Sequence, residues 1–145
     1  MSLANDLRRA AALGWRGRMD LLRAAAELAI ARIRLSTIAP EALVARDRIE
    51  GREAPSPGQA ALIDRVAFAL PRMAARVPWR ASCLVQALAG QRWLARFGIA
   101  SELVLGARKP VDGDMEAHAW LKAGERIVVG GESGDYQPFR PSRRP

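Results

Sequence analysis

The 145 residues contain one cysteine and one histidine, and these two side chains together could catalyse a reaction. Cys83 follows Ser82 at the start of a predicted helix, where unpaired backbone N–H groups and the helix dipole favour a thiolate over a thiol. His118 lies between two alanines in a predicted strand, which leaves room for a second group to approach the ring. A thiolate and an imidazole that meet can cleave an amide by acyl transfer, with the histidine moving the proton.

The same two counts exclude several other kinds of site. One cysteine cannot form an intramolecular disulfide, and one cysteine with one histidine cannot supply the ligands of a typical zinc site. We therefore expect no metal and no cofactor. A structural role for the pair stays open from these residues alone, because an isolated helical cysteine is most often a small buried hydrophobic residue.

A third group would hold the histidine ring and stabilise its charged form. If the hairpin that follows His118 turns at Gly124, strand alternation places Gly130 opposite His118 and Glu132 on the same face. Glu132 is therefore the candidate third catalytic residue, and Asp135 is the alternative. A pair of cysteine and histidine without a third member also fits the sequence.

The first half of the chain has the periodicity of helices. Apolar residues recur every three to four positions over residues 20–35. Pro40 and Pro57 each open a further helix, since proline fits the first helical position. Pro71 is expected to end or kink the second of these helices.

The second half changes from helical to strand periodicity. The helix that begins at Cys83 is predicted to end at Gly98, a residue that favours helix termination. Three short strands follow, over residues 99–107, 115–122 and 126–130. Helices followed by an antiparallel meander predict an α+β fold.

The formal net charge of +8 comes almost entirely from arginine, since Lys109 and Lys122 are the two lysines among 23 basic residues. The arginines are spread along the chain, whereas a nucleic-acid site would gather them on one face. We therefore expect no nucleic-acid ligand. A non-enzymatic, arginine-rich binding protein is nevertheless an alternative to an enzyme, and an acidic peptide or protein partner suits the charge equally well.

Neither a membrane span nor a secretory signal is expected. Charged residues occur throughout the first 20 positions, and arginines and a glutamate interrupt the most apolar stretch, residues 21–35. The expected location is the cytoplasm, where a single thiol stays reduced.

Three sequence blocks resemble a known family. They are RASCLVQAL around Cys83, RFGIASELVLG over residues 96–106 and AHAW around His118. Over residues 77–139 they occur in the order found in the lasso-peptide leader peptidases of the transglutaminase-like and papain-like cysteine protease superfamily. The resemblance implies a papain/transglutaminase-like core, in which the Cys-bearing helix precedes a small antiparallel sheet and the helical N-terminal half packs on this core.

The resemblance also implies an activity. Such a peptidase cuts a ribosomally made precursor peptide between leader and core, and a separate ATP-dependent cyclase then closes the core into a macrolactam ring. By the motif, Cys83 is the nucleophile and His118 is the general base and acid. The family's usual third residue is an aspartate, and Gly130 stands at the aligned position. Transglutaminase-type or amidase-type acyl transfer with the same triad is the alternative reaction.

Some members of the family carry an N-terminal winged-helix module that recognises the leader. Residues 1–60 have helical patterns without the strand pairs of such a module. The resemblance therefore implies a split form, in which a separate small recognition protein delivers the leader. The expected organisation is an N-terminal helical region (1–60), a cysteine protease core (61–139) and a basic tail (140–145), together forming one compact domain.

Overall fold

A computed structural model describes residues 8, 12, 14–49, 51, 54–131 and 136–138. Within these ranges the helices precede an antiparallel sheet whose strand order is β3-β2-β1-β4. This arrangement confirms the predicted α+β fold, with helices in the first half and a small sheet in the second. The elements are α2 (Gly14–Leu35), α3 (Pro40–Arg46), α4 (Pro57–Ala74), α5 (Cys83–Ala95), β1 (Glu102–Arg108), β2 (Glu116–Ala123), β3 (Arg126–Val129) and β4 (Gln137–Pro138).

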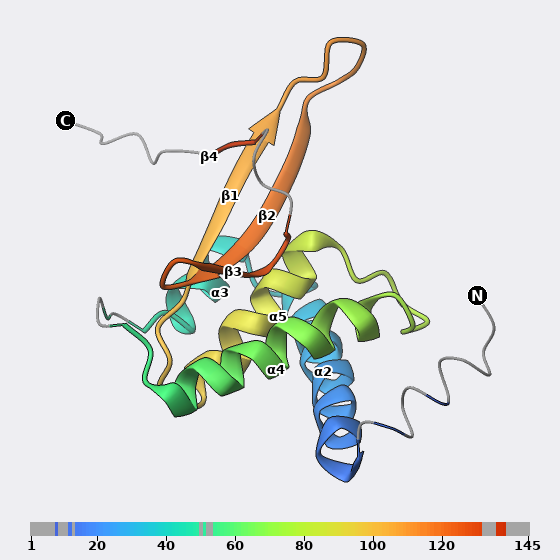
Figure 1. The fold of residues 1–145 in the computed structure, drawn as a ribbon. Coiled ribbons are helices and arrows are strands. Elements are labelled where there is room, and N and C mark those ends of the chain that lie inside the picture. The colour runs from blue at the N-terminus through green and yellow to red at the C-terminus, as the bar shows by residue number, and fades with distance from the viewer. Residues whose placement is uncertain are drawn as a thin grey trace.

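The sheet stands on a layer of helices (Figure 1). Strands β1 and β2 form a long hairpin whose far end projects beyond the helices, and β3 lies near the base of this hairpin. Helix α5 packs against α2 and α4 on one side and against β2 and β3 on the other. The helix that begins with the cysteine is therefore the central element of the fold.

The sheet approaches α5 closely because one residue of the helix has no side chain. A Cβ atom at Gly90 would lie 2.7 Å from Cδ2 of Leu121 in β2 and 3.2 Å from Cδ1 of Leu70 in α4. Interiors are packed to nearly crystalline density, so a larger residue would push these elements apart. Further fully buried core residues are Leu28, Val66, Ala69, Ala87, Ala89 and Leu94.

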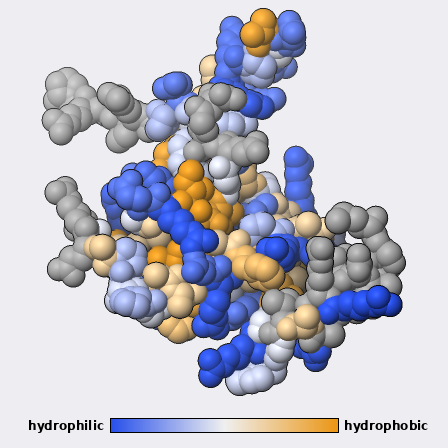
Figure 2. Space-filling model, viewed as in Figure 1, coloured by the Kyte–Doolittle hydropathy of each residue, from blue (hydrophilic) through white to orange (hydrophobic). Residues whose placement is uncertain are grey.

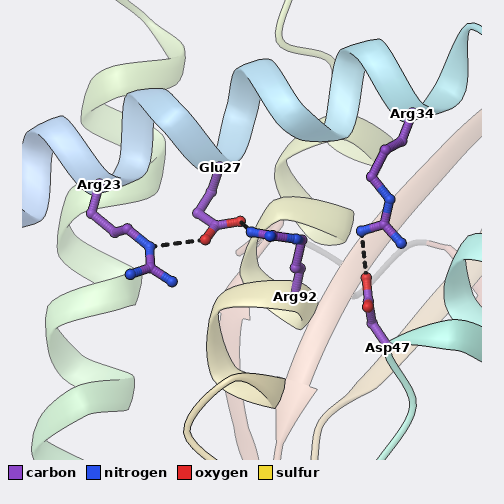
Figure 3. Close-up of polar contacts among 5 residues, drawn as sticks. All are labelled: Arg23, Glu27, Arg34, Asp47 and Arg92. Atoms are coloured by element: carbon purple, nitrogen blue, oxygen red, sulfur yellow. Dashed lines mark hydrogen bonds and ion pairs between the residues drawn. The ribbon is translucent and has the colours of Figure 1, made fainter.

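A buried ion pair joins α2 to α5 on the side away from the sheet (Figure 3). The Glu27 side chain is 1% exposed, and its two carboxylate oxygens accept hydrogen bonds from Arg23 (2.8 Å) and from Arg92 of α5. Both oxygens are thus paired, as a buried carboxylate requires. Nearby, Arg34 donates to Asp47 at 2.9 Å and ties α2 to the end of α3.

Hydrophilic residues are spread over the surface shown in Figure 2, and a hydrophobic patch lies where the sheet meets the helices. Among the helices of the described ranges, none combines the length and the apolar character needed to traverse a bilayer.

Three helix boundaries differ from the sequence prediction. Helix α5 ends at Ala95, with Arg96 as its C-cap residue, and does not reach the predicted end at Gly98. Helix α2 begins at Gly14, six residues before the predicted start at Asp20. Helix α4 does not end at Pro71 but continues to Ala74, because the proline removes one donor while the following turn stays hydrogen-bonded. The Ala75 amide closes that turn by donating to the Pro71 carbonyl at 3.2 Å.

We expect Glu27→Gln to lower the free energy of unfolding by about 3 kcal/mol, since it removes the charge that pairs two arginines in a buried position. Urea unfolding followed by circular dichroism measures this change. Glu125→Gln, at an exposed position in the β2–β3 turn, is the matched control and should stay within about 0.5 kcal/mol of the parent. Equal stability of the two variants would show that the buried pair does not hold the helices together.

Candidate active site

Cys83 is the first residue of α5, as the sequence predicts. Ser82 is the N-cap residue with extended backbone angles (φ −64°, ψ 169°), and its Oγ accepts a hydrogen bond from the Val85 amide at 3.4 Å. The cysteine is half-buried and its thiol is free. The thiol therefore lies at the positive end of the helix dipole.

The segment before Cys83 is held by side chains from two helices. Arg32 of α2 donates to the Arg80 carbonyl at 3.2 Å. Gln86 of α5 donates to the Ala81 carbonyl at 3.0 Å. These contacts fix the path of the chain into the helix, and with it the position of the cysteine backbone.

His118 lies in β2, opposite Gly106 of β1. The β2 residues that alternate with it, including Ala119 and Leu121, are buried in the core against which α5 packs. The His118 ring is half-buried, and its Nε2 lies 3.1 Å from the main-chain oxygen of Gly130. A carbonyl oxygen can only accept, so this contact is a hydrogen bond in the tautomer that carries a proton on Nε2.

Aromatic rings pack beside the imidazole. The centroid of the Tyr136 ring lies 4.7 Å from that of His118, and the centroid of Trp120 lies 6.0 Å away in a stacked arrangement. The Arg108 guanidinium lies over the Tyr136 ring and donates to the Glu116 carboxylate at 2.8 Å. The Tyr136 hydroxyl donates to the same carboxylate at 3.5 Å. The imidazole is thus held by stacking as well as by its hydrogen bond.

The backbone at Gly130 has no room for a side chain. Its φ angle of 87° lies in the left-handed region, which disfavours residues other than glycine. A Cβ atom there would lie 2.7 Å from Cβ of Trp120 and 2.8 Å from the Ala119 carbonyl oxygen. Because these atoms belong to the backbone or are attached directly to it, no change of rotamer relieves the clash.

The predicted register of the second hairpin is wrong. The chain does turn at Gly124, but a β-bulge follows and the pairing places Leu121 opposite Val129. Beside the turn, the pairing of Ala123 with Arg126 already differs from the predicted register by one position, and the extra residue of the bulge shifts the partner strand by one more. Gly130 is therefore not directly opposite His118, although its carbonyl oxygen still reaches the ring.

The structure places the two proposed catalytic residues on neighbouring elements without joining them by a hydrogen bond. Helix α5 packs against β2 and β3, and within the described residues the thiol of Cys83 forms no hydrogen bond to the His118 ring. Catalytic hydrogen bonds often tighten only when substrate binds. The predicted third members, Glu132 and Asp135, lie outside the described residues.

Several groups around His118 have no clear signal in the sequence. Tyr136 reaches the ring because β4 pairs with β1, but two residues are too few to show strand alternation. Arg108 and Glu116 face each other at the loop end of the β1–β2 hairpin, so only the correct pairing of the two strands brings them together. Over the described part of the chain, no three His, Cys, Asp or Glu side chains converge as metal ligands.

We expect Gly130→Ala to lower the free energy of unfolding by about 1–3 kcal/mol, because the new methyl group strains a left-handed backbone against Trp120. Gly131→Ala is the matched control, since a Cβ atom there meets nothing within 4 Å. Urea unfolding compares the two variants. If the two variants have the same free energy of unfolding, the backbone at Gly130 is not constrained by its φ angle and by Trp120.

Comparison with known proteins agrees with this arrangement. A family model described as the transglutaminase-like superfamily matches residues 6–144, which include the N-terminal helices as well as Cys83 and His118. No match was found among curated proteins or among solved structures. The family match covers nearly the whole chain, and the α+β fold with a cysteine-led helix beneath an antiparallel sheet is consistent with it. The chain therefore belongs to the transglutaminase-like superfamily.

Proposed function

We propose that this protein is a cysteine peptidase that removes the leader from a ribosomally made lasso-peptide precursor. Its superfamily includes cysteine peptidases and acyltransferases. The observation that carries the proposal is the placement of its one cysteine at the start of the central helix, on which the histidine-bearing strand packs. The sequence blocks around these two residues support the choice of lasso precursors.

In the first half of the proposed reaction the thiolate of Cys83 attacks the carbonyl carbon of the scissile peptide bond. The first-turn N–H groups of α5 are available to stabilise the negative charge that develops on the carbonyl oxygen. A carbon–sulfur bond forms and the carbon–nitrogen bond breaks. The His118 imidazolium gives its proton to the leaving nitrogen, which departs as the free amine of the core peptide.

In the second half, water attacks the thioester that links the leader to Cys83. Neutral His118 takes one proton from this water as the new carbon–oxygen bond forms. The carbon–sulfur bond breaks, the leader leaves with a carboxyl terminus, and the thiolate and imidazolium are restored. Each peptide bond cleaved consumes one water molecule.

The proposal also assigns partners. The precursor supplies leader and core, and a separate small recognition protein delivers the leader, because the N-terminal half of this chain is helical in its described part. An ATP-dependent macrolactam cyclase is the next enzyme to act, since it uses the amine that cleavage frees. We assign the reaction to the cytoplasm, where a ribosomally made precursor first becomes available.

We expect Cys83→Ala to lower the rate of leader removal at least about 10,000-fold, because the nucleophile is lost. His118→Ala should lower the rate at least about 100-fold, the typical contribution of general acid–base catalysis. Mass spectrometry of a lasso precursor, incubated with enzyme and recognition protein, measures the products. Glu125→Ala, at an exposed position in the β2–β3 turn, is the control and should cleave like the parent.

The products also separate the proposed reaction from the acyltransferase alternative. Hydrolysis adds one water across the cleaved bond, whereas acyl transfer joins the leader carbonyl to an added amine. If folded Cys83→Ala still cleaves the precursor, the mechanism is wrong. A product in which the leader is coupled to the amine would instead assign the chain to the acyltransferases of its superfamily.

A further inference from the structure

We propose that the main-chain carbonyl of Gly130 is the third member of the site, in the place of a side-chain acid. This inference rests on the proposed function, because it assigns a positioning role toward the general base His118. The carbonyl oxygen lies 3.1 Å from Nε2 of the ring, within hydrogen-bonding distance. It therefore performs the orienting task that an aspartate or asparagine performs in other cysteine or serine hydrolases.

The hydrogen bond decides which nitrogen of the neutral ring carries the proton. A main-chain carbonyl has no hydrogen to donate, so the contact forms only when Nε2 is protonated. The lone pair of the neutral ring then lies on Nδ1. Nδ1 is accordingly the atom whose proton goes to the leaving amine in the first half of the reaction and that takes a proton from water in the second.

The Gly130 carbonyl can take this role because residue 130 has no side chain. With φ at 87° and less than 3 Å between a Cβ atom at this residue and the backbone of β2, the position excludes aspartate in the observed conformation. The left-handed turn that glycine permits carries the chain out of β3 beside Trp120 and brings the carbonyl to the ring of His118. The glycine at the position of the expected acid thus brings a main-chain acceptor to Nε2 of the ring.

The ring is also held against a flip. A half-turn about its bond to Cβ would replace Nε2 by a carbon and break the hydrogen bond to Gly130. Tyr136 packs beside the ring at 4.7 Å between centroids, and Arg108 and Glu116 hold the tyrosine through its ring face and its hydroxyl. These contacts favour the orientation that presents Nδ1 for proton transfer.

The tautomer of His118 tests the proposal directly, because the protein has one histidine and its ring signals need no assignment. Long-range proton–nitrogen correlation spectra of the ¹⁵N-labelled full chain, recorded at alkaline pH where an imidazole is neutral, report the protonation of each ring nitrogen. We expect Nε2 to resonate as a protonated nitrogen and Nδ1 as an unprotonated one. A ring protonated on Nδ1 would overturn the proposal.

Variants separate the carbonyl from the acids that the sequence suggests. In Gly130→Ala the shifted backbone should leave a mixture of tautomers, and kcat should fall about 100-fold with KM near that of the parent. Gly131→Ala should keep the Nε2-protonated ring. Glu132→Gln and Asp135→Asn should keep it too. Loss of this tautomer in either carboxylate variant would assign the role to that acid and overturn the proposal.

Failure of the proposed function is distinguishable from failure of this inference, because the spectra require no substrate. If the ring is protonated on Nε2 but no precursor is cleaved, the peptidase assignment fails and the ring assignment holds. If cleavage depends on Cys83 and His118 but the ring is protonated on Nδ1, the peptidase assignment holds and the role of the carbonyl fails. Should Gly130→Ala not fold, the spectra of the parent and of the two carboxylate variants decide the question.

Discussion

The close approach of α5 to the sheet determines where the cysteine and the histidine lie relative to each other. Gly90 allows it, since a methyl group at this position would overlap the buried side chain of Leu121. On the far side of the helix, Arg92 is paired with the buried carboxylate of Glu27, which fixes α5 against α2. A helix held from both sides has little freedom to slide, so the backbone of Cys83 keeps one position relative to β2.

The contacts around His118 are mostly polar and aromatic, whereas those between α5 and the sheet are apolar. The core beneath the sheet is apolar, whereas the imidazole lies among glycine, aromatic and charged groups near the edge of that core. Its principal partner is a main-chain oxygen, whose position depends on the backbone of β3 and on the bulge in its pairing with β2. The fold therefore places the cysteine through helix packing and orients the histidine through the path of one short strand.

Local patterns in the sequence were sufficient to predict the fold class and the two elements that carry Cys83 and His118. Ser82 marks the start of the Cys83 helix correctly, whereas Gly98 lies three residues beyond its end at Ala95. Alternation locates β2 around His118. The partner of the histidine could not be predicted in this way, because a bulge has no compositional signature and shifts every later pairing by one residue. A pattern of side chains also cannot show that a carbonyl, common to all residues, is the acceptor.

If Cys83 and His118 act as a reactive pair, the rate at which iodoacetamide alkylates the thiol depends on both residues. Cys83 is the one cysteine, so loss of free thiol reports this site alone. We expect the native protein to react readily below pH 7, His118→Ala to react more slowly, and the two proteins to react equally in urea. Equal rates in the native state, or reaction only after unfolding, would show that the two residues do not form such a pair.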